Sequence, residues 1–515
     1  MLTFSFNAAV DDVTPVEKLA AESLGAKSVE KCLILKKSVD ARRKDKICYV
    51  YRVAVEVKNE HKYINNKVSY YNMNIPTVER MTIGRKLFCR PVVVGSGPCG
   101  LFAALTLAYL GARPIVIERG DDADTRIKKT KEFISSLKLD TESNVQFGEG
   151  GAGTFSDGKL NTGVNNDYVL AVINEFVLCG APEEISYAAK PHIGTDLLVG
   201  VIKNLRKKII SLGGEFRFRT KLIDIETAAG SVVAAVTDKG KIPCDRIYLA
   251  IGHSARDTFE MLYEKSVKMT SKTFSMGVRI EHLSEDINRA QYGEAAKFLP
   301  AADYKMAVDT ERYGKMYTFC MCPGGRVINA SSEEGAVCVN GMSEHARNGI
   351  NSNSALLINV GADDFKTEHP LGGMEFQRKY EKKTYALSGG YKPVAQTVGD
   401  FLSGKSGSAF SSVKPSVETG FVLGNLEECL PEKVFRGIRA GIPLIGKRMK
   451  GFDCPQAALT GIEARSSSPI KILRDEKCVS SINGLYPLGE GAGYAGGITS
   501  AAADGIRGVL SDADV

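Results

Sequence analysis

The sequence predicts an α/β fold, and three observations support this prediction. Residues 91–120 place an apolar helical pattern, at 101–110, between two short apolar runs at 92–94 and 115–117. This order is typical of a βαβ unit with parallel strands. The composition, 43% hydrophobic and 25% charged, is that of an average globular protein and excludes a disordered or collagen-like chain. The length of 515 residues is enough for about three domains.

The first 88 residues predict a small basic α+β domain. A helix is expected at 15–24, because Thr14 and Glu17 have the spacing of a capping box and Gly25 is a suitable stop. Residues 31–39, 47–57 and 67–75 are rich in residues that favour strands. Residues 1–90 hold 17 Lys and Arg against 10 Asp and Glu, which accounts for the whole net charge of +7.

The densest basic run lies in this domain, followed by two tyrosines: Lys36, Lys37, Arg42, Arg43, Lys44, Lys46, Tyr49 and Tyr51. Such a patch is typical of surfaces that bind nucleic acid. It is also typical of an ordinary solvated face, which we favour because Asp40 and Asp45 dilute the run and no RNA-binding signature accompanies it.

A glycine turn, Gly95-Ser96-Gly97-Pro98-Cys99-Gly100, joins the first strand of the βαβ unit to its helix. In the pattern GxGxxG the first glycine permits a tight turn, the second lets the backbone approach a pyrophosphate, and the third lets helix and strand pack closely. The phosphates would lie at the helix N-terminus, whose free amides carry about half a positive charge. Glu118 follows Gly100 by 18 residues and would accept hydrogen bonds from a ribose. The sequence therefore predicts a dinucleotide site.

Three distant segments are also rich in glycine. Residues 148–163 contain six glycines, which suits a backbone wrapped around a flat cofactor. Residues 244–255, CDRIYLAIGHSA, form a predicted strand that ends at Gly252 and follows a strand meander at 215–243. Residues 484–505, GLYPLGEGAGYAGGITSAAADG, lead into a helix expected from 501 to 510.

With these segments, residues 90–515 resemble the bacterial FAD-dependent dehydrogenases, many of them uncharacterised, within the two-dinucleotide-binding flavoprotein superfamily. The resemblance implies FAD, bound by the glycine turn and by Glu118 with Arg119 at the end of its strand. It also implies that the backbone of Leu222 meets the adenine and that the strand ending at Gly252 returns to FAD. Glu490 would bind the ribityl chain, and a helix entered through Gly496, Gly497 and Ile498 would point at the flavin pyrimidine.

The implied architecture is a discontinuous Rossmann-like FAD-binding domain, at 89–256 and 480–515, with an inserted α+β substrate domain at 257–479. The small α+β domain at 1–88 precedes it. No second GxGxxG follows a strand, so NADH or NADPH, if used, would visit the flavin transiently. No cysteine lies in GGAGTFSDGK, where related flavoproteins carry a redox disulfide, and no cysteine spacing indicates a metal site.

Catalytic residues are not identified by any pattern in the sequence. Lys159 is a candidate cation beside the flavin, and Arg279 and Arg465 could clamp an anionic substrate or form ordinary salt bridges. Cys320 and Cys322 are expected to be packing residues on one face of a strand. Five histidines are acid or base candidates by type alone, and for each a structural role is favoured: His192, His253, His282, His345 and His369.

The predicted function is that of a cytoplasmic oxidoreductase that moves a hydride between FAD and a small organic molecule. No secretory signal or membrane span is expected. Two alternatives stay open: a flavin-dependent enzyme that modifies nucleic acid such as tRNA, gripped by the basic domain, and a flavin-binding regulator without enzymatic activity.

Overall fold

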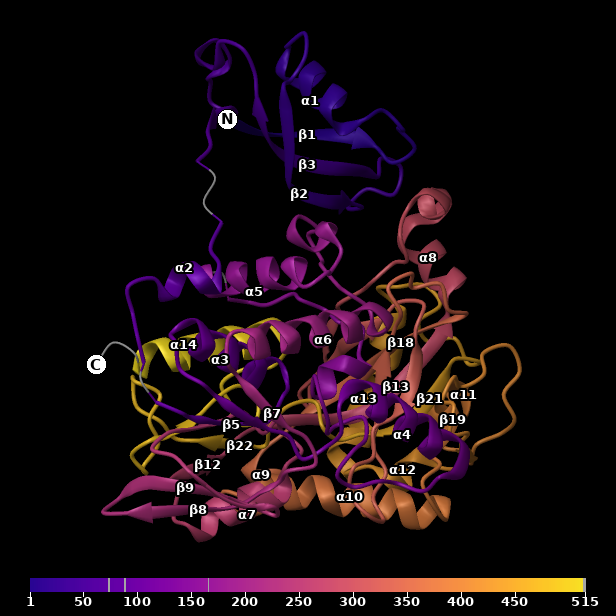
Figure 1. Cartoon of the computed structure of the whole chain (residues 1–515). Helices are drawn as coiled ribbons and strands as arrows, with labels where there is room; N and C mark the ends of the chain where they lie inside the picture. The colour runs from indigo at the N-terminus through magenta and orange to yellow at the C-terminus, as the bar shows by residue number, and fades with distance from the viewer. Residues whose placement is uncertain (73–74, 88, 165, 513–515) are drawn as a thin grey trace.

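The computed structural model describes residues 1–72, 75–87, 89–164 and 166–512. The domain boundary expected at 88 and the chain end expected to close the FAD-binding domain, 513–515, lie outside the described residues. Figure 1 shows three regions: a small N-terminal sheet, a parallel sheet under a layer of helices, and a larger mixed sheet beside it.

The N-terminal region is an antiparallel sheet with strand order β2-β3-β1-β4 and one helix on its apolar face. The sequence interpretation missed β1, although Phe4 and Phe6 are buried and alternate with exposed Ser5 and Asn7. The elements are β1 (Leu2–Ala9), α1 (Val16–Leu24), β2 (Lys31–Asp40), β3 (Cys48–Glu56) and β4 (Ser69–Tyr70).

The capping box expected at Thr14 does not form. The N-cap of α1 is Pro15, and no side chain caps the helix. The reason is local: the amide of Thr14 donates to Asp12 Oδ1 at 2.9 Å, and the turn at Asp12 sets the path into the helix instead.

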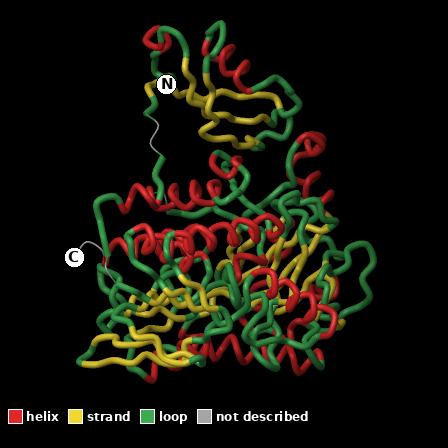
Figure 2. Tube along the Cα trace, in the orientation of Figure 1, coloured by secondary structure: helices red, strands yellow, loops and turns green. Residues whose placement is uncertain are grey.

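The connection from this region already belongs to the body of the protein at α2 (Val78–Thr82). Val78 is fully buried in the core cluster that contains Phe102 of α3 (Pro98–Tyr109) and Phe176 of α5 (Asp167–Leu178). The side-chain amide of Asn174, also in α5, donates from Nδ2 to the carbonyl of Pro76 at 2.8 Å. The N-terminal sheet lies above these helices (Figure 2), and its strand β2 contacts the body of the protein, where Lys37 pairs with Ala188. A division of the chain at 88 would therefore separate α2 from the helices on which it packs.

The central sheet is fully parallel, with strand order β23-β11-β5-β6-β7. Val93 faces the helices, whereas Val92 and Val94 face the meander β8-β9-β10, so both sides of β5 are buried. Its elements and those that cover it are β5 (Val92–Val94), α3 (Pro98–Tyr109), β6 (Ile115–Ile117), α4 (Ala123–Ser136), α5 (Asp167–Leu178), α6 (Thr195–Ser211), β7 (Glu215–Arg217), β8 (Leu222–Ala228), β9 (Ser231–Thr237), β10 (Gly240–Pro243), β11 (Ile247–Leu249), α7 (Arg256–Glu264), β23 (Leu485–Pro487) and α14 (Ile498–Asp512).

The second large sheet has seven strands in the order β14-β15-β18-β13-β21-β19-β20, and α13 packs on it. Two further pairs of strands, β12 with β22 and β16 with β17, are separate from this sheet. The elements of this part of the chain are β12 (Met269–Ser271), β13 (Phe274–Leu283), α8 (Ser284–Tyr292), β14 (Ala307–Asp309), β15 (Lys315–Cys322), β16 (Arg326–Asn329), β17 (Val339–Met342), β18 (Asn351–Val360), α9 (Ala362–Phe365), α10 (Gly372–Ser388), β19 (Val394–Thr397), α11 (Val398–Ser403), β20 (Val422–Leu423), α12 (Leu426–Cys429), α13 (Glu432–Gly446), β21 (Ala458–Glu463) and β22 (Ile470–Ile472).

No helix among the described residues has both the length and the apolar composition that a membrane crossing requires.

Candidate functional site

A cavity of about 480 Å³ lies where the carboxyl ends of the parallel strands meet the mixed sheet. Ligand sites of open α/β sheets lie at this edge, and their volumes are roughly 300–1,000 Å³. Of the residues expected to bind the cofactor, those that line the cavity are Gly95, Gly97, Pro98, Cys99, Glu118, Arg119, Lys159, Leu222, Gly252, Glu490, Gly496, Gly497 and Ile498. Ser96 and Gly100 lie immediately behind this wall.

The three glycines of the turn have different surroundings. Gly95 has φ +98°, and a Cβ there would lie 2.4 Å from the carbonyl oxygen of Ala250. A Cβ on Gly100 would lie 1.9 Å from the carbonyl oxygen of Gly95, so this glycine lets α3 start against the turn. A Cβ on Gly97 would project into free space, 3.7 Å from the Cα of Gly151. The first and third glycines thus serve the fold, and the second leaves room in the cavity.

Glu118 organises the turn. Its Oε2 accepts hydrogen bonds from the amide and hydroxyl of Ser96, at 2.9 and 2.8 Å, and its Oε1 accepts from the amides of Gly120 and Gly148, at 2.9 and 3.0 Å. A carboxylate has about four acceptor sites, so these donors occupy all of them. A ribose hydroxyl would have to share or replace one of these bonds, which the sequence interpretation did not foresee.

Arg126 shapes the glycine-rich loop, and the sequence interpretation missed it. This fully buried guanidinium donates to the carbonyls of Asn144, Val145 and Glu149, at 2.8, 2.8 and 2.7 Å. Gly148 provides the room, because a Cβ there would lie 2.4 Å from Arg126 Cδ. The available signal was an arginine inside α4, directly after the Glu118 strand, with six glycines beyond it.

The C-terminal segment lines the cavity beside the turn. Gly505 lets α14 pack on α3, since a Cβ there would lie 2.3 Å from the carbonyl of Cys99. Cys99 is correspondingly buried, which raises the pKa of its thiol and makes it a packing residue. Gly496 and Gly497 have no neighbour within 4 Å of a Cβ position. The N-termini of α3 and α14 therefore meet at one cavity, as an anionic cofactor requires.

Two segments of the backbone lie against each other beside Glu490. A Cβ on Gly491 would lie 2.5 Å from the carbonyl of Gly252, so the strand that ends at Gly252 touches the C-terminal segment. Burial raises the pKa of Glu490 to about 7, which Lys272 counteracts only in part. His253 Nε2 lies 3.9 Å from Glu490 Oε1, and burial together with Arg465 and Arg256 lowers the pKa of His253 to about 4. A neutral imidazole therefore faces a carboxyl group that gains and loses its proton near neutral pH.

The other four candidate histidines lie elsewhere. His192 and His345 stack on each other, with ring centroids 5.2 Å apart, and bond to backbone carbonyls. His282 is buried against Phe452, and His369 stacks on Tyr263. Their structural interpretation is consistent with these contacts.

Both candidate arginine clamps are fully engaged by protein groups. Arg465 is bidentate with buried Glu381 through bonds of 2.8 and 2.7 Å. Arg279 pairs with Glu463 and donates to the carbonyl of Cys320 at 2.8 Å. The salt-bridge alternative therefore describes them, and neither offers a free guanidinium to a substrate.

The wall opposite the glycine turn is built by β15. Lys159 Nζ donates to the carbonyl of Met321, so this cation lies beside Cys320. Cys320 itself lines the cavity, which corrects the expectation that both cysteines of β15 only fill the core. Tyr304 also lines this wall.

Arg119 lines the cavity, as Leu222 does. It pairs with Glu142 and Asp257, and its guanidinium lies 4.4 Å from the ring centroid of Phe147. Its charge is therefore balanced by carboxylates of the protein.

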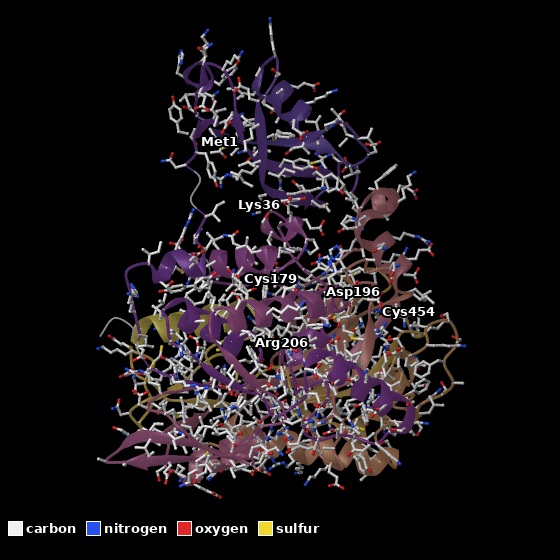
Figure 3. The ribbon with its side chains drawn as sticks, viewed as in Figure 1. Met1, Lys36, Cys179, Asp196, Arg206 and Cys454 are labelled. Carbon is white, nitrogen blue, oxygen red and sulfur yellow. The ribbon has the colours of Figure 1, made fainter. Side chains whose placement is uncertain are left out.

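Two of the six basic side chains in the N-terminal run pair with carboxylates within the described part of the chain. Arg42 pairs with Asp40, and Arg43 pairs with Asp45. Lys44 donates to the carbonyl of Ala290, and Lys37 lies 4.3 Å from the ring centroid of Tyr49. Lys36 lies at the edge of this region nearest the body (Figure 3).

Comparison with known proteins shows which family the chain belongs to. Residues 273–466 match the family model described as "FAD-dependent protein, C-terminal domain-like", and residues 2–56 match a domain of unknown function. An uncharacterised protein of Clostridium beijerinckii is 46% identical over 509 residues, covering 96% of this chain and 95% of that protein.

Solved structures of low similarity were also found. A quinol fumarate reductase of Escherichia coli is 13% identical, with a TM-score of 0.37, over 84% of this chain and 70% of that chain. A glycine oxidase of Bacillus cereus is 11% identical, with a TM-score of 0.31, over 83% of this chain and 96% of that chain.

Proposed function

We propose, since this chain belongs to the family of FAD-dependent proteins that includes its relative from Clostridium beijerinckii, that it is an oxidoreductase that transfers a hydride between FAD and a small organic substrate. One observation carries the proposal: the N-termini of α3 and α14 converge on a single cavity lined by Gly97, Gly496 and Gly497.

The residues of the cavity fit FAD. The backbone at Gly97 and the amides at the start of α3 would hold the pyrophosphate, because no side chain fills this space and the helix end favours negative charge. Glu118 would hold the ribose, and Leu222 with Arg119 would flank the adenine. Glu490 and the start of α14 would lie along the ribityl chain and the flavin.

FAD, when bound, supplies the hydride chemistry, and the protein supplies position and electrostatics. The start of α14 would stabilise negative charge, and half-buried Glu490 would hold or release a proton at its carboxyl group. His253, kept neutral by burial, would accept or donate a hydrogen bond without adding charge. The mixed sheet lines this end of the cavity and would hold the substrate.

The test is anaerobic reduction of the bound flavin. NADH, NADPH and a panel of small metabolites are added separately to the purified protein, and the flavin absorbance is followed. Bleaching by one donor, with reoxidation by one acceptor, supports the proposal. Flavin that no donor reduces and no acceptor reoxidises would favour a flavin-binding regulator.

The nucleic-acid alternative has less support from this structure, because Arg42 and Arg43 each pair with a neighbouring carboxylate. A cytoplasmic location is consistent with the cysteines, since all twelve are free thiols.

A further inference from the structure

Two cysteines of β15 stand at the place where the mixed sheet meets the cavity. Cys320 lines the cavity, and Cys322 is fully buried behind it. The pairing of β15 with β18 shifts register between Phe319 and Cys322, and Cys320 has φ +41°. A non-glycine residue in this conformation is strained, and such strain concentrates at functional sites, where a bulge redirects a side chain.

The surroundings of the pair are polar and cationic. Arg279 donates to the carbonyl of Cys320 at 2.8 Å, and Lys159 donates to the carbonyl of the next residue. Tyr304 lines the same wall and is only 5% exposed, yet its hydroxyl has no hydrogen-bond partner among the described residues. A buried hydroxyl without a partner costs free energy, so it favours a polar ligand at this wall.

The two thiols differ in acidity. The nearby Cys322 thiol lowers the pKa of Cys320, burial opposes this shift, and the charges of Arg279 and Lys159 lower the pKa further. The neighbouring Cys320 and burial raise the pKa of Cys322. Burial also raises the pKa of Cys338, which lies immediately before strand β17. An accessible acidic thiol next to a buried one of high pKa is the arrangement of an attacking and a resolving cysteine.

The spacing allows a disulfide. Two residues along an extended strand span about 6.6 Å, and disulfides join Cα atoms that are roughly 4.4 to 6.8 Å apart. The Cys322 thiol also points back toward Cys320, because its Sγ lies 3.3 Å from the Cys320 carbonyl oxygen.

We propose that Cys320 and Cys322 form a redox pair that passes two electrons from reduced FAD to a substrate disulfide. The cofactor in this scheme rests on the proposed function, with NADH, NADPH or another hydride donor as the source of the electrons. The pair would replace, on the substrate side of the cavity, the redox cysteines that the loop around Lys159 lacks.

The sulfur chemistry balances in two exchanges. The Cys320 thiolate attacks one sulfur of the substrate, the substrate S–S bond breaks, a mixed disulfide forms, and the first substrate thiolate leaves and takes a proton. Cys322 then loses its proton and attacks Cys320 Sγ, which forms the Cys320–Cys322 disulfide and releases the second substrate thiol. The substrate has gained two electrons, and FAD, when bound and reduced, would supply the two electrons and one of the two protons that break the Cys320–Cys322 S–S bond and restore both thiols, with the second proton taken from solvent.

The experiment uses the purified holoprotein. Trypsin cleaves after Lys315 and Arg326, so both cysteines fall in one peptide, MYTFCMCPGGR, and Cys338 falls in the next. The protein is oxidised with diamide, unfolded, blocked with iodoacetamide and digested without reductant. We expect this peptide about 2 Da lighter than its dithiol form and free of alkylation.

Cysteine-to-serine variants identify which residues form the disulfide. Cys320→Ser and Cys322→Ser should each leave one alkylated cysteine in the peptide, and the matched control Cys338→Ser should keep the lighter peptide. Full alkylation of both cysteines after oxidation, or a disulfide to another cysteine, would overturn the proposal.

A second measurement tests the electron path. Photoreduction of the bound flavin under anaerobic conditions should restore alkylation of MYTFCMCPGGR in oxidised wild-type protein; a pair that stays closed overturns the exchange with FAD. The visible spectrum reports flavin content separately. Protein that closes the disulfide but carries no flavin contradicts the proposed function, and flavin-loaded protein that never closes it contradicts only the redox pair.

Discussion

Ser96 and Glu118 are joined twice, because the amide and the hydroxyl of Ser96 both donate to Oε2 of Glu118, at 2.9 and 2.8 Å. This contact ties the glycine turn after β5 to the end of β6. The residue expected to bind a ribose is thus also the residue that holds the turn in place, so a substitution of Glu118 should affect both stability and cofactor binding.

Glu118→Gln should lower both stability and FAD content. The amide NH2 group of glutamine would face buried N–H donors, and each unsatisfied donor costs about 1–3 kcal/mol. We expect a loss of about 2–4 kcal/mol in the free energy of unfolding, measured by urea denaturation. Ser96→Ala is the control, since it removes one hydroxyl and should cost about 1 kcal/mol. Equal stability of Glu118→Gln and wild type would contradict the role of Glu118 in the turn.

Gly97→Val and Gly100→Ala should fail in different ways. Gly97 has φ −72° and free space at its Cβ position, so the valine variant should fold and lose FAD. Gly100→Ala would drive a Cβ to 1.9 Å from a carbonyl oxygen, which should destabilise the protein by about 1–3 kcal/mol or more. Thermal unfolding and the visible spectrum measure both effects. Yellow Gly97→Val protein with full FAD occupancy would show that the pyrophosphate lies elsewhere.

Removal of the N-terminal sheet should leave FAD binding intact if α2 is kept. A chain that starts at Pro76 retains buried Val78, whereas a chain that starts at Cys89 loses it, at a cost of about 1.5–3 kcal/mol for the side chain alone. We expect flavin content near that of the full chain in the longer truncation and a lower unfolding temperature in the shorter one. A folded, colourless protein starting at Pro76 would indicate that the N-terminal sheet helps to retain the cofactor.

Glu490→Gln should change how the stability of the FAD-free protein depends on pH. Burial raises the pKa of Glu490 from 4.5 to about 7, so the folded protein holds a proton that the unfolded chain releases. The stability from this group is fully present below about pH 4.5 and is lost as the pH rises to 7. The glutamine variant should therefore gain in unfolding temperature, relative to wild type, by about 2 °C or more between pH 4.5 and 8. A difference that does not vary with pH would mean that the carboxyl group is ionised throughout.

Sulfite should bleach the bound flavin. The start of α14 lies at the cavity, and a helix N-terminus stabilises nearby negative charge by roughly 1–2 kcal/mol in a partly buried site. Sulfite addition leaves such a charge on the flavin. The absorbance is titrated at neutral pH, and flavin that resists sulfite would argue against this position of α14.

Much of the central region could be predicted because its signals are local. Val92–Val94 and Ile115–Ile117 are strands with the expected bounds, and α3 begins at Pro98, three residues before the apolar run that predicted it. The reason is that proline at the first helical position sets the start, whereas the interpretation followed hydrophobicity. The first strand, β1, and α4 were missed, since β1 was considered only as a possible leader and α4 is polar on most of its surface.

The sequence by itself determined the glycine turn at 95–100 and the acid at 118, which follow from spacing and backbone sterics, whereas the second glycine entry at 496–497 was implied only by the resemblance to FAD-dependent flavoproteins. Only the tertiary structure decided which residues contact the candidate site residues. It satisfied Arg279 and Arg465 with buried carboxylates, selected His253 from five histidines, and turned Cys320 toward the cavity while Cys322 stayed behind it. Such outcomes depend on contacts between residues far apart in the sequence, 84 positions for Arg465 and Glu381 and 184 for Arg279 and Glu463, and burial and charge at those contacts set what each side chain can do.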